Sequence, residues 1–482
     1  MKFYNFADEY EKQDELFKVW CEGKRIKTYA CDVSAVAFNQ VWQGRQRSFS
    51  QTEKSAFVTL GNDGETVLTI QPKKSFQKVV VRPLEKNVKT EARGNEVEIT
   101  FTHPGQYTVE FDGMHYTLAV FINPEKDFSA YRNGKNVLYF GEGVHYVDKR
   151  IMLEDNQTVF IDEGAVVYAS INAIGKKNIQ VVGYGILDNS RMERQNAIQT
   201  NPNIVKEENK KMGLPIYFDR CENILVEGIT IVDSSEWSLK FTGCKNVLVD
   251  NIKLIGLWRY NADGCDFCNC VDATIKNSFL RTFDDSIVVK GLDCSRELPV
   301  ENILAENCVV WCDWGRCLEI GAETCAPYMK NITFRNCYLI HGSDVMMDVQ
   351  QGDSADISQV LFDNVSIEYT GEEQRTAIET DSVTEYPYYG IKHIPRIFEI
   401  RSLVTMWSHD SCAGNTDDVR FQNIRIVTAD GEIPQGSRAI TRGEGNRISN
   451  VVFENITCNG KRVTLQELGF SVDGNVENVI EK

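Results

Sequence analysis

Three aspartates in this chain have the spacing and company needed for acid–base chemistry. Asp263 lies in the segment NADGCD (residues 261–266), and Asp284 and Asp285 follow in FDDS (residues 283–286). Hydrolysis of a glycosidic bond needs one protonated carboxyl group to donate to the leaving oxygen and one ionised carboxylate to activate water. Repulsion between neighbouring carboxylates separates their pKa values and so assigns the two roles. The three aspartates therefore predict a glycosidase site.

The aspartates lie in a part of the chain that repeats itself. Units such as KNIQVVGYGIL, ENILVEGITIV and KNVLVDNIKLI each combine two short strand-like segments around a Gly, Asp or Asn corner. One asparagine of the unit recurs at intervals of 26, 30, 29 and 28 residues, at Asn251, Asn277, Asn307, Asn336 and Asn364. Repeats of this length made of short strands predict a parallel β-helix, whose coils stack about 4.8 Å apart. We expect the asparagines to form a ladder of stacked amides at one corner.

The repeat length places the aspartates relative to one another. Asp285 follows Asp263 by 22 residues, close to one coil, so we expect Asp263 beside the pair on the neighbouring coil. In a flat strand Asp284 and Asp285 would face opposite sides, and an ionised carboxylate in the apolar core would be costly. We therefore expect the pair at a strand start or a bulge, with both carboxylates reaching solvent. Asp266 and Asp272 are expected at turns or on the surface.

Residues 1–125 show a different pattern and are predicted to form a separate β-sandwich. Short strand-like segments alternate there with polar turns, a spacing typical of a sandwich. The predicted strands are Ala56–Leu60, Thr66–Ile70, Lys78–Arg82, Val97–Phe101, Tyr107–Phe111 and Tyr116–Phe121. Residues 126–482 are assigned to the β-helix, with an inserted loop at Thr370–Thr384, a further coil near Arg396–Val404 and a closing cap after Gly460.

Composition limits the possible partners. The chain has 482 residues, of which 42% are hydrophobic and 25% are charged, and this balance indicates a folded globular protein. Its net charge of −17 repels phosphate backbones, so we expect no nucleic acid partner. No apolar run approaches the length of a membrane span, so we expect no membrane partner. The first residues lack the pattern of a signal peptide, which favours a cytoplasmic protein whose 15 cysteines are reduced.

Several cysteines have the short spacings that zinc sites use. They are Cys265, Cys268, Cys270, Cys308, Cys312 and Cys317. Cysteine is also a small apolar residue that suits the inward face of a coil, and Cys268 and Cys270 share strand parity. The six histidines form no ligand motif such as His-Glu-x-x-His. We therefore predict a structural role for the cysteines and neither a metal site nor another cofactor.

The two aspartate segments resemble motifs of glycoside hydrolase family 28, the polygalacturonase family. Residues 261–266 are similar to the family's Asn-Thr-Asp-Gly-x-Asp, and residues 283–290 to its Asp-Asp-Cys-Ile-Ala-Ile-Lys. Trp237, in Ser-Ser-Glu-Trp-Ser-Leu, is similar to the Trp of a Ser-Pro-x-Trp segment one coil earlier. The resemblance covers residues 137–460 and implies a right-handed parallel β-helix that acts as an inverting hydrolase without a metal.

The resemblance also implies roles for single residues. It makes Asp284 the general acid, with Asp263 and Asp285 activating water. The chain departs from the family at GRCLEIG (residues 315–321), where the family has Gly-His-Gly-x-Ser-Ile-Gly, so Arg316 stands at the histidine position. The family's Arg-Ile-Lys has its nearest counterpart at Arg396. Arg316 can hold a carboxylate through its planar fork, or it can form a surface ion pair with Glu319 or Asp313.

A second group of residues is assigned to substrate binding: Lys290, Arg316, Asn261, Trp237, Trp258, Arg259 and Glu319. Lys290 either points toward the cleft, where it would bind substrate or lower a carboxylate pKa, or is a solvated lysine at a strand end. Trp258 and Arg259 directly precede the first aspartate motif. Trp258 either forms a sugar platform there or packs at the edge of the core.

The sequence thus predicts an all-β protein, a right-handed parallel β-helix with an N-terminal β-sandwich domain. Its predicted function is inverting hydrolysis of an α-linked glycan or oligosaccharide, galacturonan-type or related, by exo-action on short oligomers. A sandwich followed by a β-helix also resembles family 49, the dextranase and isopullulanase family, which keeps an α-glucan hydrolase open. A polysaccharide lyase and a non-catalytic glycan-binding β-helix are the remaining alternatives, and three mutually repelling carboxylates argue against the latter.

Overall fold

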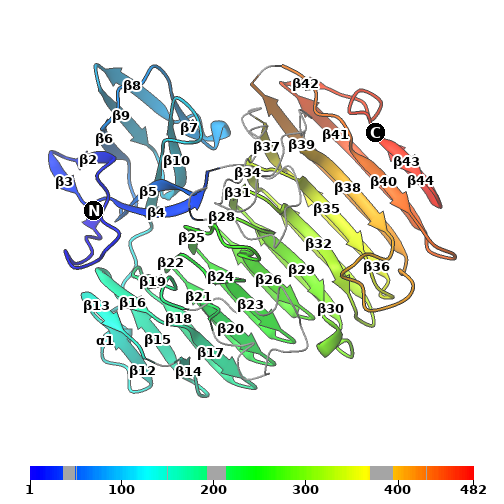
Figure 1. The fold of residues 1–482 in the computed structure, drawn as a ribbon, viewed down its shortest axis with the longest axis horizontal. Coiled ribbons are helices and arrows are strands. Elements are labelled where there is room, and N and C mark those ends of the chain that lie inside the picture. Colours follow the sequence, from blue (N-terminus) through cyan, green and yellow to red (C-terminus); the bar gives the residue numbers. More distant parts are fainter. Residues whose placement is uncertain (36–48, 50–51, 149, 193–212, 370–394, 430) are drawn as a thin grey trace.

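The computed structural model describes residues 1–35, 49, 52–148, 150–192, 213–369, 395–429 and 431–482. Regular structure in these residues is almost entirely β-strand, and the strands form two groups (Figure 1). The helical segments are η2 (Leu84–Lys86), α1 (Ser129–Arg132) and η4 (Asp293–Ser295). No helix in these ranges is both long and apolar enough to cross a bilayer.

The N-terminal group is a β-sandwich of two sheets. One sheet contains β1 (Lys2–Phe3), β4 (Tyr29–Ser34), β5 (Thr52–Gly61), β7 (Val79–Arg82), β10 (Gly105–Phe111) and β11 (Thr117–Asn123). The other contains β2 (Phe17–Cys21), β3 (Lys24–Ile26), β6 (Thr66–Pro72), β8 (Lys89–Arg93) and β9 (Glu96–Phe101). Alternate side chains from both sheets, such as Val58, Phe101 and Val109, form one apolar core. The six predicted segments are strands, which confirms the sandwich.

The second group is a parallel β-helix, as predicted, in which each coil adds strands to two long sheets. The 22-stranded sheet contains β12 (Val137–Phe140), β13 (Gly143–Tyr146), β15 (Thr158–Ile161), β16 (Ala165–Tyr168), β18 (Lys177–Val182), β19 (Ile186–Asp188), β21 (Glu222–Glu227), β22 (Thr230–Val232), β24 (Lys245–Asp250), β25 (Lys253–Ile255), β27 (Val271–Lys276), β28 (Phe279–Thr282), β30 (Val300–Glu306), β31 (Val309–Cys312), β33 (Met329–Arg335), β34 (Tyr338–His341), β36 (Ile357–Asp363), β37 (Ser366–Tyr369), β39 (Thr416–Thr428), β41 (Ile448–Cys458), β42 (Lys461–Arg462) and β44 (Val476–Glu481). The 11-stranded sheet contains β14 (Ile151–Met152), β17 (Ile171–Ile174), β20 (Ile216–Asp219), β23 (Leu239–Thr242), β26 (Cys265–Cys268), β29 (Ile287–Gly291), β32 (Arg316–Thr324), β35 (Val345–Gln351), β38 (Arg396–Ser402), β40 (Arg438–Thr441) and β43 (Ser471–Asp473).

Identical positions of successive coils stack on one another inside and outside the β-helix. Inside, the rings of Phe334, Phe362 and Phe421 lie in register with centroids 4.9 Å apart at each step. At the corner, Asn307 donates to Asn277 at 2.7 Å. Both asparagines adopt the left-handed backbone conformation, with φ of 53° and 51°. The predicted asparagine ladder is therefore confirmed, because an αL corner suits Asn and the coil spacing brings amides within bonding distance.

Other sequence expectations are met to differing degrees. The coil expected near Arg396–Val404 is β38, and β42 to β44 follow Gly460 as expected for a closing segment. The expected inserted loop at Thr370–Thr384 lies outside the described residues. The division into residues 1–125 and 126–482 stays a prediction, with β11 ending at Asn123 and β12 beginning at Val137.

The sandwich packs directly on the 22-stranded sheet. Phe57 and Phe121 of the sandwich share one buried apolar cluster with Ile255, Phe279 and Trp311 of the β-helix. The ring of Phe121 lies 5.2 Å from that of Phe279. Burying aromatic side chains of this size stabilises the contact by the hydrophobic effect. The two parts therefore form one packed body.

Charged groups are buried in the same interface. Arg82 and Glu110 of the sandwich form an ion pair at 3.0 Å, and Arg82 also pairs with Glu368 of β37 at 2.5 Å. His341 of β34 lies 2.7 Å from Glu110. Burial by itself raises the pKa of Glu110, but His341 and Arg82 outweigh it and lower the pKa to about 2. Breaking such a buried cluster is costly because a charge is left without its partner.

Replacing Glu110 by Gln should therefore lower the free energy of unfolding by about 3 kcal/mol at pH 7. A carboxylate with a lowered pKa stabilises the fold above its unfolded pKa of about 4 and loses this effect as the pH falls toward 2. The difference between parent and variant should shrink over that range in urea unfolding. Glu91→Gln, which breaks exposed ion pairs with Lys89 and Arg93, is the control and should leave the urea midpoint nearly unchanged. A difference that does not depend on pH would refute the assignment.

Candidate active site

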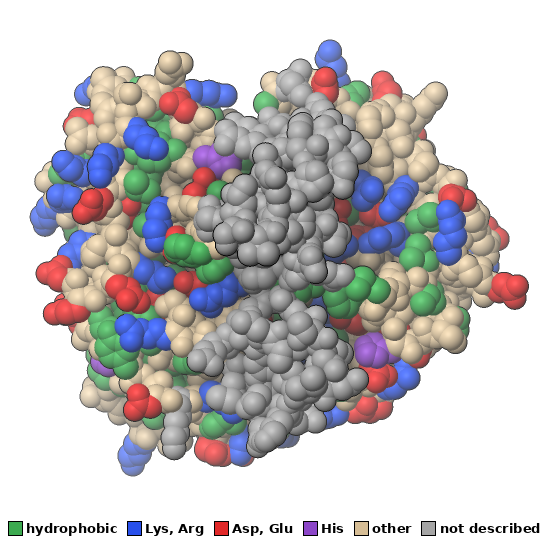
Figure 2. Space-filling view, in the orientation of Figure 1, with side chains coloured by type: hydrophobic (Ala, Val, Ile, Leu, Met, Phe, Trp, Pro, Cys, Tyr) green, Lys and Arg blue, Asp and Glu red, His purple; other side chains and the backbone are tan. Residues whose placement is uncertain are grey.

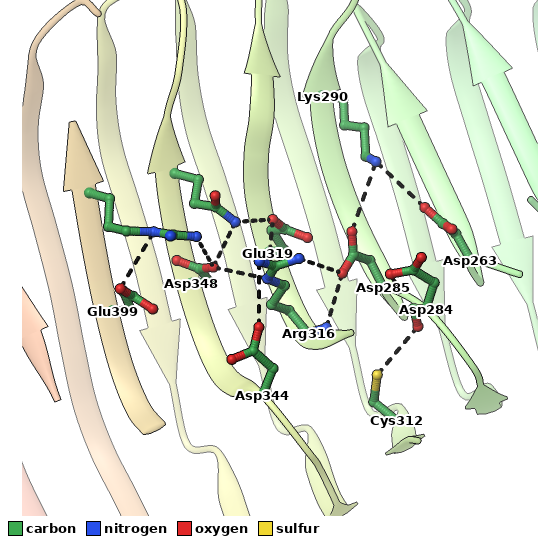
Figure 3. A network of polar contacts seen from close by, with 12 residues as sticks. Asp263, Asp284, Asp285, Lys290, Cys312, Arg316, Glu319, Asp344, Asp348 and Glu399 are labelled. Atoms are coloured by element: carbon green, nitrogen blue, oxygen red, sulfur yellow. Dashed lines mark hydrogen bonds and ion pairs between the residues drawn. The ribbon is translucent and has the colours of Figure 1, made fainter. Parts of the chain in front are cut away.

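The three predicted catalytic aspartates meet at the corner that leads into the 11-stranded sheet (Figure 3). Asp263 lies two residues before the start of β26, and Asp284 and Asp285 lie between β28 and β29. Gly264 N donates to the carbonyl of Asp285 at 2.8 Å, and Asp284 N donates to that of Ala262 at 3.2 Å. The two turns are therefore bonded to each other on neighbouring coils, as the 22-residue spacing predicts.

The turns approach so closely that they depend on glycine. A Cβ added to Gly264 would lie 2.2 Å from the carbonyl oxygen of Ser286.

The side chains of Asp284 and Asp285 were expected to reach solvent, but the residues are only 4% and 7% exposed. The predicted place at a strand start is correct and the predicted exposure is wrong, because neighbouring coils and charged side chains cover the pair.

Lys290 holds the carboxylates together from β29. Its Nζ lies 3.5 Å from Asp263, 3.8 Å from Asp266 and 3.9 Å from Asp285. It also lies 3.8 Å from Glu323 and is 5% exposed, so it is not a solvated lysine at a strand end. Lys290 therefore belongs to the cluster as an internal counter-charge.

Asp266 is a correction to the sequence analysis. It is fully buried in β26 rather than placed at a turn or on the surface. Its neighbours Cys265 and Phe267 point into the apolar core, so alternation along the strand turns Asp266 outward toward Lys290. Burial raises the pKa of Asp266 to about 7. Asp272 does lie at an exposed corner, where it accepts a hydrogen bond from Asn302 at 2.7 Å.

The three aspartates have different electrostatic surroundings. Burial and the neighbouring Asp285 raise the pKa of Asp284 well above its ordinary value. Burial also acts on Asp285, but Arg316 and Lys290 outweigh it and lower the pKa of Asp285. Burial and Asp266 raise the pKa of Asp263. The pKa shifts of adjacent residues therefore run in opposite directions, which favours the protonated form at Asp284 and the ionised form at Asp285, while Asp263 is shifted toward the protonated form.

Arg316 lies among carboxylates on β32. Its backbone N donates to Asp285 Oδ1 at 3.0 Å. Its guanidinium lies 3.6 Å from Asp285, 3.4 Å from Asp344, 3.5 Å from Asp348 and 3.9 Å from Glu319. The expected alternative of a surface ion pair is correct in its partner Glu319, which lies 3.9 Å away, and wrong in its surface position and in Asp313. Glu319 is buried, and Asp313 pairs with Arg281 instead.

A row of acidic residues extends from Glu319 along the 11-stranded sheet. Glu319, Asp348 and Glu399 occupy the same register position of β32, β35 and β38, and all three are buried. Gln350 donates to Glu319 at 2.7 Å and to Asp348 at 2.9 Å. Arg401 lies 3.7 Å from Asp348 and 3.5 Å from Glu399. Apart from Glu319, these residues were missed from the sequence.

A sequence signal for this row exists. An acidic residue flanked by two apolar residues recurs as LEI (residues 318–320), MDV (347–349) and FEI (398–400). Burying a carboxylate between core residues is costly without partners. The recurrence therefore indicates a row of acidic side chains that face away from the apolar core and pair with basic side chains.

The aromatic candidates separate into two places. The ring of Trp237 lies 4.4 Å from Nζ of Lys290 and 4.3 Å from that of Lys240, which puts it beside the carboxylate cluster. Arg259 instead pairs with Asp233 at 3.4 Å and lies over Trp258.

Trp258 has a second aromatic neighbour, and Asn261 has a left-handed backbone conformation. The ring of Trp258 meets that of Phe49 at 5.6 Å. Asn261 lies in the turn before Asp263 with φ of 57°, which fits a residue that shapes the turn. Trp237 thus lies beside the carboxylate cluster, whereas Trp258 packs against Arg259 and Phe49.

The cysteines behave as core residues. All six singled out from the sequence are buried, and five of them, Cys265, Cys270, Cys308, Cys312 and Cys317, lie in the apolar core of the β-helix. Within the described ranges, one group has ligand atoms close enough for a metal: Cys325, Asp353 and Asp410. Asp353 already accepts from the backbone N atoms of Thr324 and His409, and Asp410 pairs with Arg296. These bonds account for the group without a metal.

Comparison with known proteins finds similarity over the part of the chain that holds this cluster. Residues 142–381 match the family model described as glycosyl hydrolases family 28. The protein named probable endopolygalacturonase D of Neosartorya fischeri is 22% identical over 247 residues, which cover 50% of this chain and 42% of that protein. The chain thus spans less than half the length of this curated relative.

Two solved structures share the fold over most of their length. Dex49A from Penicillium minioluteum has a TM-score of 0.68 at 15% identity, covering 100% of this chain and 96% of that one. The family 28 exopolygalacturonase of Yersinia enterocolitica has a TM-score of 0.51 at 12% identity, covering 87% and 96%. At these identities the likeness concerns the fold. The carboxylate cluster of this chain thus lies within the segment, residues 142–381, that matches the model of glycosyl hydrolases family 28, in a fold that the chain shares with Dex49A.

Proposed function

We propose that the protein is a glycoside hydrolase in which Asp284 is the general acid and Asp285 is the base. The observation that carries the proposal is the opposite direction of the pKa shifts of these two adjacent residues. Asp284 donates its proton to the glycosidic oxygen as the bond to the anomeric carbon breaks. Asp285 takes a proton from the water that attacks that carbon. Lys290 compensates the negative charge of Asp285 and links it to Asp263.

We propose single displacement with inversion, as the family resemblance implies. The first-formed product should then have the anomeric configuration opposite to that of the substrate bond. Proton NMR of a reaction followed before mutarotation checks this expectation. A first-formed anomer with the substrate's configuration would indicate a retaining mechanism with a covalent intermediate instead.

We propose α-linked short oligomers as substrates and release of single terminal sugars. Product analysis over time tests this by whether monosaccharide appears from the first turnovers or only after shorter oligomers accumulate. An unsaturated, UV-absorbing product would identify a lyase and contradict the hydrolase proposal.

The pairing of the cations favours an uncharged glucan as a second candidate substrate beside a galacturonan. Lys290 and Arg316 each lie within 3.9 Å of four carboxylates. A uronate would compete with these groups for the same cations. Lys and Arg side chains also lie among Asp and Glu side chains on the face in Figure 2. Hydrolysis of oligogalacturonides compared with isomalto-oligosaccharides and pullulan fragments separates the two candidates.

A further inference from the structure

A buried arginine joins the N-terminal sandwich to the turn that carries Asp284 and Asp285. Arg281 lies in β28, three residues before Asp284, and is 2% exposed. We infer that Arg281 is a positioning residue for these two aspartates and that the sandwich holds it in place. The inference rests on the proposed hydrolase function and gives the N-terminal strands a part in catalysis.

Arg281 has partners on both sides of the interface. Its Nη1 donates to Ser55 Oγ at 3.1 Å and to Thr117 Oγ1 at 3.5 Å, both in the sandwich. On the β-helix side its Nε lies 3.5 Å from the carboxylate of Asp313. Its guanidinium carbon lies 3.7 Å from the ring centroid of Trp311. A planar, permanently charged group suits this combination of stacking, ion pairing and hydrogen bonding.

The sandwich contacts are a large part of what orients this guanidinium. Nε and Nη2 of Arg281 have no hydrogen-bond partner among the described residues, so its hydrogen bonds there are the two that Nη1 makes. Ser55 and Thr117 are themselves bonded to each other at 3.1 Å, which fixes the two acceptors. Removing these hydroxyl groups should therefore free the arginine to shift while its stacking on Trp311 remains.

The residue after Arg281 is hydrogen-bonded to the backbone of Asp284. Thr282 follows it in β28, and the hydroxyl of Thr282 donates to the carbonyl of Asp284 at 2.7 Å. The carbonyl of Thr282 accepts from the backbone N of Asp313 at 2.9 Å. The Arg281–Asp313 ion pair thus joins the same two neighbouring coils as this backbone hydrogen bond.

The turn that follows Asp313 contacts Asp285 through Gly315 and Arg316. A Cβ added to Gly315 would lie 2.5 Å from both the backbone N and the carboxylate of Asp285. Arg316 N donates to that carboxylate, and the carbonyl of Arg316 accepts from Ser286 N at 2.8 Å. A shift of this turn therefore moves the Asp285 carboxylate relative to Asp284, and small misplacements of reacting groups lower the rate strongly.

The test removes the sandwich side of the contact and leaves the catalytic turn unchanged. In the full-length Ser55→Ala/Thr117→Val variant, we expect kcat to fall about 10-fold with KM within about twofold, because Arg281 acts on geometry and not on substrate binding. Hydrogen exchange of backbone amides in residues 282–290 and 313–317 should become faster. Tyr10→Phe is the matched control, since it removes a buried sandwich bond to Asp188 at 2.9 Å on a distant coil. It should leave kcat and those amides unchanged.

Two variants of the arginine extend the test. Arg281→Lys keeps the charge beside Asp313 and should retain about 10-fold more activity than Arg281→Met. Unchanged kcat and unchanged exchange in the sandwich variant, with a lower Tm, would overturn the inference. If the parent hydrolyses no glycan, the proposed function fails, and the exchange data alone decide the positioning role. Faster exchange in both turns would then support it, and unchanged exchange would overturn it.

Discussion

Asp284→Asn should lower kcat on a natural oligosaccharide by about 10³-fold, within the range that general acid catalysis contributes. Asparagine keeps the shape of the side chain but cannot donate the proton that the leaving oxygen needs. The pKa of Asp284 is raised in the folded protein, so folding disfavours its ionised form. A neutral amide should therefore not lower the Tm. Steady-state kinetics and thermal unfolding of the same preparations measure both effects.

An activated substrate makes this prediction specific to the acid. An aryl glycoside with a good leaving group needs little protonation, so Asp284→Asn should lose much less activity on it. Asp285→Asn should lose activity on both substrates, because water activation is needed in each case. Equal losses for Asp284→Asn on both substrates would show that Asp284 is not the general acid.

Arg316→Gln should move the acidic limb of the kcat/KM profile to higher pH. Burial favours the neutral form of Asp285, and Arg316 followed by Lys290 outweighs it and lowers its pKa. Without the guanidinium the carboxylate takes up a proton at higher pH and stops serving as a base. We expect kcat/KM at neutral pH to fall about 10²-fold. A pH–rate profile from pH 4 to 9 measures the shift.

The free energy of unfolding is a second measurement that tests Arg316→Gln. An aspartate with a lowered pKa stabilises the fold above its unfolded pKa of about 4, and that contribution is lost as the pH falls through the folded pKa. Arg316→Gln should therefore cost about 3 kcal/mol at pH 7, and the difference should shrink below pH 4. Arg316→Lys should give an intermediate profile. Arg447→Gln, which breaks an exposed ion pair with Glu477, is the control and should change neither the pH–rate profile nor the stability. If the acidic limb does not move in Arg316→Gln, Arg316 does not lower the pKa of the catalytic base.

The sequence alone determined the β-helix and the meeting of the three aspartates. Both follow from periodicity. Asn277 and Asn307 recur at the coil length, and Asp263 and Asp285 are one coil apart. In a solenoid each coil contacts its neighbours, so a distance along the chain translates directly into a position in space. This is why the turns of Asp263 and Asp285 could be placed side by side without a structure.

Burial of the site could not be obtained in the same way. Asp284 and Asp285 were expected to reach solvent, and Asp266 was expected at a turn or on the surface. In the structure all three are buried, and the side chains of Lys290 and Arg316 reach Asp285 from β29 and β32. Strand alternation gives the side of the sheet a residue faces, but not whether charged neighbours cover it.

The contacts between the N-terminal sandwich and the β-helix could be learned only from the tertiary structure, because the two parts have no common sequence repeat. Arg281 meets Ser55 across 226 residues, and His341 meets Glu110 across 231. Neither the sandwich pattern nor the coil length indicates which face of the sandwich meets which strands, because many apolar faces of similar size are compatible with both. The periodic sequence thus predicts where the carboxylates lie, whereas the side-chain contacts of Arg316 and Lys290 shift their pKa values, and packing against the sandwich holds Arg281 beside Asp313.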